Sequence, residues 1–310
     1  MEDIQNSLPE PEETKVSPAP RKKLYAEHIL AIMAFVLAGV LAFLIIACRP
    51  YFGMEEDDPL LEVNRRPVPT APVEVQPGET VPGAPQPEKN PYGPLDFQYD
   101  GRYLGCIKAE TVPGIDVSKY QGIIDWQKVK ESGIEFVIVR IGYRGYGQEG
   151  KIKDDDYGIR NIQGALAAGL KVGVYFFSQA ITPEEAVEEA EFVLQRIRGY
   201  NITMPVVFDW EYINDEARTA NMDPRTLTDC YLAFSEKIAG AGYTPMAYFN
   251  TYQSRDMMYL TELEEYPFWL ALYSDRMNFP YRIEMWQYSD NGRVPGIQGA
   301  VDLNLYFVEE

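Results

Sequence analysis

Histidine is almost absent from this chain, which has 310 residues and a single histidine, His28. His28 lies at the edge of an apolar run, outside any segment that would form a folded domain. The sequence therefore excludes Ser-His-Asp and Cys-His nucleophilic sites, the HExxH zinc motif and histidine-ligated metals in general. We expect no metal site, so the chemistry of the folded part must come from carboxylates, lysine, tyrosine or a cofactor.

Cysteine and positive charge are also scarce. Three cysteines are too few for a disulfide framework, and their spacing does not match a zinc site. The 28 lysines and arginines face 47 aspartates and glutamates, which gives a formal net charge of -19. An acidic surface repels phosphate backbones, so we expect no nucleic-acid partner. No glycine-rich phosphate loop follows the first expected strand, so we expect no nucleotide and no cofactor.

One long apolar run is present near the N-terminus. Residues 29–47 form an uncharged stretch of about nineteen residues, enough to span a bilayer as a helix. Basic residues precede it and acidic residues follow it, which predicts a cytoplasmic tail over 1–28 and an extracellular remainder. We predict an uncleaved transmembrane signal-anchor over 29–48 in the cell membrane. Two alternatives remain: a cleaved signal peptide, or a lipoprotein that is cleaved before Cys48 and lipidated on that residue.

Proline is concentrated after this run. Residues 49–110 are proline-rich and show little apolar periodicity, which predicts a semi-extended extracellular linker. A spacer of this kind suits a substrate layer that lies at some distance from the membrane, such as a cell wall. A linker without any length requirement is the alternative. The folded domain is expected over residues 111–310.

Short apolar segments alternate with helical ones along this domain. The five earliest expected strands are each followed by a helical segment, and the last three are not. The strands are expected over 114–118, 136–142, 171–178, 204–210, 245–250, 268–273, 283–288 and 301–307. Strands that are apolar on both faces indicate a sheet buried on both sides. Eight of them favour closure, so we predict an α/β fold, a distorted TIM-like barrel of the (β/α)5β3 type.

Four carboxylates fall where such a barrel places its active site, at one mouth. They are Asp116, Asp209, Glu211 and Asp302. Asp209 and Glu211 are two apart on a strand, so both side chains point the same way, with Cα atoms about 6.6 Å apart. Like charges this close raise one pKa, which keeps one carboxyl protonated as an acid beside a charged neighbour. Glycoside hydrolysis needs this pairing, whereas a solvated or salt-bridged strand end is the plainer alternative.

Aromatic and amide side chains are expected around the same mouth, where aromatic rings would stack on the faces of sugars. The predicted substrate-binding residues are Tyr143, Tyr175, Trp210, Tyr248, Asn250, Trp286 and Gln287. Trp269 and Tyr273 are left open between a core role and a sugar platform.

Several short motifs resemble one known family when they are taken in order. They are the opening GIDVS of residues 114–118 with Gln121-Gly122, the DWE of 209–211, the WQY of 286–288 and the VDLN of 301–304. This set resembles glycoside hydrolase family 25, the N,O-diacetylmuramidases or bacterial and phage-type lysozymes, over residues 113 to 308. The resemblance implies five β/α units and three final strands. It also implies peptidoglycan glycan strands as substrate, cut at the β-1,4 bond between N-acetylmuramic acid and N-acetylglucosamine.

The resemblance also implies roles for the four carboxylates. Glu211 corresponds to the general acid, Asp209 to its partner, and Asp116 and Asp302 to two supporting aspartates. Retention is implied, with Asp209 acting either as a nucleophile or by orienting the N-acetyl group of the substrate, and the D-x-E arrangement favours the second role. One departure is Phe176, which stands where many members have a histidine.

Two other functions are compatible with the same fold. The domain would be a peptidoglycan-binding module that no longer cuts, or a hydrolase of another N-acetylated glycan such as chitin. The intact set of four carboxylates favours an active enzyme, because a silent binder has no need of all four.

Overall fold

The structure is a computed structural model that describes residues 87–308. The predicted tail over 1–28, the predicted span over 29–48 and the linker as far as residue 86 lie outside these residues. Among the residues described, no helix is both long and apolar enough to cross a membrane.

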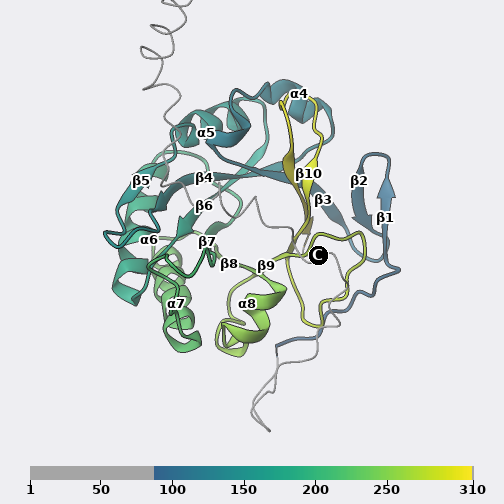
Figure 1. The fold of residues 1–310 in the computed structure, drawn as a ribbon. Helices are drawn as coiled ribbons and strands as arrows, with labels where there is room; N and C mark the ends of the chain where they lie inside the picture. Colours follow the sequence, from purple (N-terminus) through teal and green to yellow (C-terminus); the bar gives the residue numbers. More distant parts are fainter. Residues whose placement is uncertain (1–86, 309–310) are drawn as a thin grey trace, which may run out of the picture. The chain divides into compact units, whose positions relative to one another are not determined.

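Within residues 87–308, eight strands close into a barrel (Figure 1). In chain order they are β3 (Thr111–Val117), β4 (Phe136–Arg144), β6 (Lys171–Ser178), β7 (Val206–Trp210), β8 (Pro245–Asn250), β9 (Phe268–Ala271), β10 (Met285–Gly292) and β11 (Val301–Phe307). Neighbours from β3 to β4 and on to β10 are parallel, and the pairing of β3 with β4 closes the ring. The prediction of an eight-stranded α/β barrel is confirmed.

The last strand differs from the others in direction. β11 lies between β10 and β3 and is antiparallel to both. The beginning of β11 therefore lies at the barrel mouth where the parallel strands end. This reversal brings Asp302, near the start of β11, opposite Asp116, near the end of β3.

Helices cover the outer face of the earlier strands. They are α4 (Trp126–Glu131), α5 (Gly158–Ala167), α6 (Pro183–Ile197), α7 (Pro224–Gly240) and α8 (Thr251–Asp256). The caps explain where α6 and α7 begin, since Thr182 and Asp223 each accept a backbone N–H and a proline follows. A short strand, β5 (Ile152–Asp154), extends the sheet beyond β4. Two single turns of 3-10 helix, η1 (Lys119–Gln121) and η2 (Leu260–Glu262), lie in loops.

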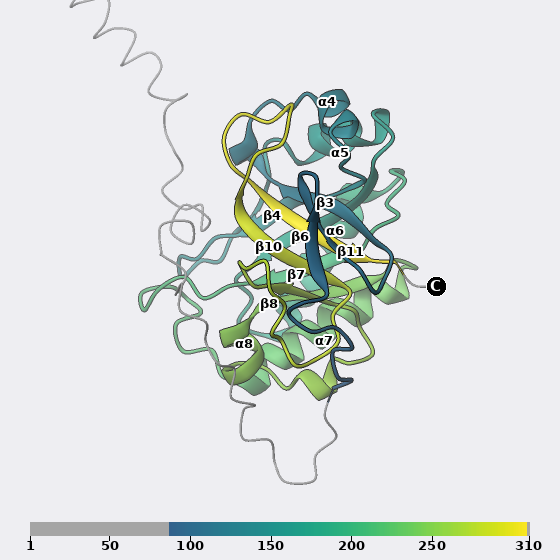
Figure 2. The same ribbon diagram turned by 90° about the vertical axis from the view of Figure 1, so that its right-hand side faces the viewer.

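The outer side of β10 and β11 is covered by an N-terminal strap, residues 87–106, in place of a helix. It ends in a hairpin of β1 (Phe97–Asp100) and β2 (Tyr103–Cys106), which lies beside β3 and β10 in both views (Figures 1 and 2). The ring of Phe97 meets Trp286 edge-on at 5.0 Å, and Tyr92 stacks on Phe307 at 4.9 Å between ring centroids. Residues 87–106, which the sequence analysis assigned to the linker, are thus part of the folded domain.

Alternation along the strands divides the apolar side chains into two cores. One set fills the barrel interior, and the other packs between the sheet and the helices or the strap. Phe136 fills part of the barrel interior, and its ring lies against Gly114. A Cβ atom at Gly114 would lie 2.2 Å from that ring, so the glycine of the GIDVS motif leaves the space that the Phe136 ring occupies.

The strap makes a testable contribution to stability. Replacing Phe97, which is 8% exposed against Trp286 and Phe307, with alanine should lower the free energy of unfolding by about 3 kcal/mol, since it removes a buried ring. Tyr99→Ala, in the same strand but 55% exposed, is the matched control and should cost less than about 0.5 kcal/mol. Urea unfolding measures both, and equal stabilities would contradict the packing described for the strap.

Candidate active site

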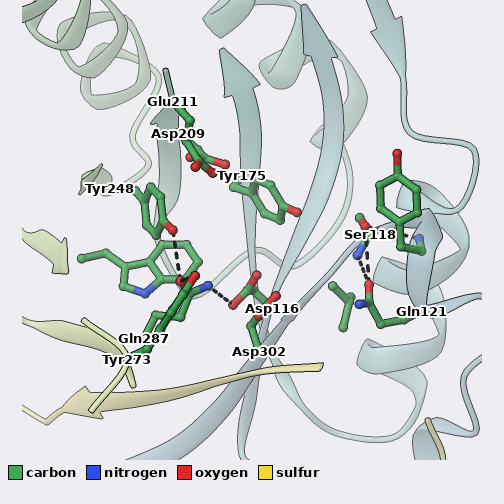
Figure 3. A pocket seen from close by; sticks show the side chains of 13 residues that line it. Asp116, Ser118, Gln121, Tyr175, Asp209, Glu211, Tyr248, Tyr273, Gln287 and Asp302 are labelled. Atoms are coloured by element: carbon green, nitrogen blue, oxygen red, sulfur yellow. Dashed lines mark hydrogen bonds between the residues drawn. The ribbon is translucent and has the colours of Figure 1, made fainter. Parts of the chain in front are cut away.

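A pocket opens at the barrel mouth where the parallel strands end (Figure 3). Its walls combine acidic, aromatic and amide side chains from β3, β6, β7, β8, β9, β10 and β11 and from the turns that follow them. They are Asp116, Val117, Ser118, Tyr120, Gln121, Tyr175, Asp209, Glu211, Tyr248, Trp269, Tyr273, Gln287 and Asp302.

All four predicted carboxylates reach this pocket. Asp209 is the penultimate residue of β7, and Glu211 is the first residue after that strand. Asp116 and Asp302 are directly paired between β3 and β11. Figure 3 shows Asp209 beside Glu211 on one side of the pocket and Asp116 beside Asp302 on another. The barrel thus brings together two carboxyl pairs that are far apart in the sequence.

Neutral amides hold Asp116 in place. The side-chain nitrogens of Gln287 and Asn304 each donate to Oδ2 of Asp116 at 2.8 Å. The amide oxygen of Asn304 accepts from the indole of Trp269 at 2.9 Å. The amide oxygen of Gln287 accepts from the hydroxyls of Tyr248 and Tyr273, at 3.0 and 3.2 Å. These aligned hydrogen bonds fix the aspartate through neutral groups.

Burial raises the pKa of every carboxyl in the pocket. Burial and the charge of Asp116 raise the pKa of Glu211 to about 7. Burial and the charge of Glu211 raise the pKa of Asp209 well above its usual range, and the Arg140 guanidinium opposes this shift. Burial and the charge of Asp116 likewise raise the pKa of Asp302. Burial thus favours the protonated form of each carboxyl, and Glu211, with a pKa of about 7, is partly protonated at neutral pH.

One oxygen of Asp209 is an open acceptor. Its Oδ1 is buried and has no hydrogen-bond partner among residues 87–308. Because an unpaired buried acceptor is costly, this oxygen is poised to accept a donor that enters the pocket.

A buried arginine lies behind the carboxylates. Arg140, one of the two arginines of β4, donates from Nε to Asp155 at 2.7 Å. Its guanidinium lies 5.3 Å from the ring centre of Tyr120 and 5.2 Å from that of Tyr143. Asp155 also accepts the backbone N–H of Lys119, so this ion pair anchors the turn that follows β3.

Three of the predicted substrate-binding residues line the pocket: Tyr175, Tyr248 and Gln287. The predicted contacts of Trp210 and Trp286 with substrate are wrong. Both side chains are fully buried in the outer core and absent from the pocket wall, and the Trp286 indole donates to the carbonyl of Leu272 at 2.7 Å. The reason is the two-residue period of a strand, which turns each tryptophan away from the polar residues beside it.

Two other predicted residues lie near the mouth but do not line the described pocket. Tyr143 is buried in the barrel interior beneath Lys119 and Arg140. Asn250 caps α8 by accepting the N–H of Gln253 at 3.0 Å. Phe176, at the position of the family's histidine, faces outward onto Phe192 at 5.7 Å between ring centroids. That departure therefore affects the outer core rather than the pocket.

Several residues of the wall were not predicted as binding residues. Ser118, Tyr120 and Gln121 line the pocket from the turn after β3, where Ser118 and Gln121 form a capping box. The feature that could have predicted their place in the pocket wall is their position directly after the end of a strand, in the opening motif. Trp269 and Tyr273, which the sequence left open, both face the pocket.

Comparisons with known proteins agree on one family. The sequence profile described as "Glycosyl hydrolases family 25" matches residues 115–297. The "Uncharacterized protein YegX" of Escherichia coli O157:H7 is 32% identical over 208 residues, which are 63% of this chain and 70% of that protein.

Two solved structures have the same barrel. The autolysin LytC of Streptococcus pneumoniae, solved with a synthetic peptidoglycan ligand, is 28% identical with a TM-score of 0.54. The match covers 64% of this chain and 47% of the autolysin, so the chain spans about half the length of that protein. The bacterial lysozyme of Streptomyces coelicolor is 26% identical with a TM-score of 0.54, over 64% of this chain and 93% of that one.

The family match covers more than half of the chain. It includes β4, β6, β7, β8, β9 and β10 and three of the four pocket carboxylates, and the fourth, Asp302 of β11, lies five residues beyond its end. The chain belongs to glycosyl hydrolase family 25.

Proposed function

We propose that this glycoside hydrolase is an N-acetylmuramidase, a lysozyme that hydrolyses the β-1,4 bond between N-acetylmuramic acid and N-acetylglucosamine in peptidoglycan. The observation that carries the proposal is the pair of Asp209 and Glu211 in the pocket at the barrel mouth, where burial and the charge of Asp116 raise the pKa of Glu211 to about 7. The names of its relatives, a lysozyme and an autolysin with a bound peptidoglycan ligand, support the substrate class.

Glu211 is suited to the role of general acid. Its side chain is partly exposed in the pocket, so it can reach a glycosidic oxygen that enters from solvent. A pKa of about 7 leaves a large protonated fraction at neutral pH. Proton transfer from Glu211 to the leaving oxygen would accompany cleavage of the bond to the anomeric carbon.

Asp209 is suited to hold the N-acetyl group of the sugar. Its open Oδ1 would accept the amide N–H of that group, which turns the amide oxygen toward the anomeric carbon. The amide oxygen then forms a bond to that carbon as the glycosidic bond breaks, and Glu211 protonates the departing sugar. Water opens the resulting oxazolinium ring with Glu211 as base, so the configuration is retained. Direct attack by Asp209 on the anomeric carbon is the alternative route.

Asp116 and Asp302 would support the developing positive charge. Asp116 is fixed by the amides of Gln287 and Asn304, so its charge is held at a set position. Asp302 lies opposite it in the pairing of β3 with β11, and burial and the charge of Asp116 raise the pKa of Asp302. A fixed negative charge near the oxocarbenium-like centre stabilises the transition state more than the ground state.

Replacing the acid should abolish cleavage. Glu211→Gln removes the proton donor at nearly constant shape, and purified peptidoglycan should then yield no new reducing ends. Wild-type digests that are reduced with borohydride should contain reduced muramic acid by mass spectrometry. Glu216→Gln, an exposed change in the same loop, is the matched control and should keep full activity.

The digest also separates the other functions. Reduced glucosamine would mean that the other glycosidic bond is cut. Cleavage of chitin but not of peptidoglycan would identify a different N-acetylated glycan as substrate. A folded wild-type protein that binds the wall without cutting it would mean a silent binding module, and wild-type rates in Glu211→Gln would refute the assignment of the acid.

The pH dependence should follow the proton on Glu211. The raised pKa means that the acid is protonated below about 7 and loses its proton above it, so kcat/KM should fall as pH rises through about 7. A rate profile between pH 4 and 9 on soluble glycan fragments measures this limb. A profile that is flat from pH 6 to 9 would contradict the role of Glu211.

We also propose that the domain works outside the cell membrane, facing the wall, with residues 29–48 as its anchor. The apolar run of about nineteen residues and the basic residues before it support this arrangement. The full chain should then sediment with membranes and be open to protease added outside the cell. Cys48→Ala should leave both results unchanged, whereas release into the medium would favour a lipid anchor on Cys48. A full chain found in the cytosol would contradict the proposal.

A further inference from the structure

The proposed acid lies just beyond the part of β7 that the sheet holds. On one side the pairing of β7 with β6 ends at Trp210, opposite Ser178. On the other side its pairing with β8 ends at Asp209, opposite Tyr248. The carbonyls of Trp210 and Glu211 therefore need partners from outside the ladder, because buried backbone acceptors rarely stay unpaired.

Two buried glutamines supply those partners. Gln179, one residue after β6, donates from Nε2 to the carbonyl of Glu211 at 2.7 Å and to that of Ser178 at 2.8 Å. Gln253 of α8 donates to the carbonyl of Trp210. The two side chains are 0% and 1% exposed. Each takes the place that a neighbouring strand would occupy if β7 were longer.

The amide of Gln179 has only one orientation that satisfies its neighbours. Its nitrogen faces two carbonyl oxygens, and its oxygen accepts the hydroxyl of Thr219 at 2.8 Å. A reversed amide would set oxygen against oxygen. Thr219 belongs to the loop after β7 and is itself 1% exposed, so it fixes the glutamine from the far side.

The loop that carries Thr219 is tied down by its neighbour, Arg218. The Arg218 backbone N–H donates to the carbonyl of Tyr146 at 2.9 Å, and its guanidinium pairs with Glu185 at 2.6 Å. The guanidinium also donates to the carbonyl of Gln179 at 3.3 Å. The loops after β4, β6 and β7 are thus joined through Arg218 and Gln179, and Gln179 in turn bonds the backbone of Glu211.

We propose that Gln179 is a positioning residue for the general acid, held in that role by Thr219. It does not line the described pocket, so it acts through the backbone of Glu211 rather than on the sugar. By fixing that carbonyl, the glutamine fixes where the Glu211 carboxyl stands relative to Asp209. The inference rests on the proposed function, since it assigns the position of the acid in that reaction.

The test replaces Gln179 with methionine, which keeps the size and removes the hydrogen bonds. A misplacement of about 1 Å costs up to about 100-fold in rate, so kcat should fall by that order while KM changes little. The pKa of Glu211, followed by carbon-13 NMR of its carboxyl, should fall below about 7 as the freed side chain turns toward solvent. The decline of the rate on the alkaline side of the pH profile should shift to lower pH together with this pKa.

Two further variants separate positioning from general damage. Thr219→Val, which removes only the hydroxyl, should cause a smaller loss of kcat and no additional loss in a Gln179→Met background, because both act through one hydrogen-bond chain. Gln163→Met removes a glutamine that is bonded to the hydroxyl of Tyr200 at 3.0 Å, on the exposed surface, and should change nothing.

Three results would overturn the inference. They are a folded Gln179→Met with wild-type kcat, a loss of kcat with the basic limb and the Glu211 pKa unchanged, and additive losses in the double variant. If the wild-type enzyme released no reducing ends, the proposed function would fail by itself. The pKa of Glu211 in the two proteins would then decide the inference alone.

Discussion

The crowding of four carboxyl groups into one largely buried pocket is the constraint on which the rest of this structure depends. Each charge there costs free energy because water is excluded and its neighbours have the same sign. The pocket holds Asp116 with the neutral amides of Gln287 and Asn304. The protonated form of each carboxyl is therefore favoured, and Glu211, with a pKa of about 7, keeps a protonated fraction at neutral pH, as a general acid requires.

The fold is arranged so that this crowding persists. The antiparallel β11 brings Asp302 to the mouth where the parallel strands end. The same side of the barrel has the strap in place of helices, and Phe97 packs on Trp286 next to the amide that holds Asp116. Outer packing by the strap and inner hydrogen bonding to Asp116 thus act on adjacent residues of β10. A stiff frame is needed because the carboxyls would otherwise relax toward solvent and regain ordinary pKa values.

Much of the fold could be predicted from sequence, because apolar runs and helix caps are local signals. The four carboxylates could be predicted as well, because they fall where the expected barrel places its active site. The two-residue period of a strand also predicts that Trp210, between Asp209 and Glu211, faces away from the pocket. The substrate contact predicted for Trp210 did not take this period into account. The strap could not be predicted, because its strands are four residues long. Their apolar side chains are buried only by contacts with residues distant in sequence, such as Trp286 and Phe307. Gln179 and Thr219 are single polar residues whose pairing exists only in three dimensions.

The most direct test of this account is the pKa of the Glu211 carboxyl, followed by carbon-13 NMR in the wild-type domain and in Asp116→Asn. The account predicts a pKa of about 7 in the wild type, because burial and the charge of Asp116 both raise it, and a lower pKa in the variant. A wild-type pKa near the ordinary value of 4.5, or a pKa that does not respond to the loss of Asp116, would contradict it.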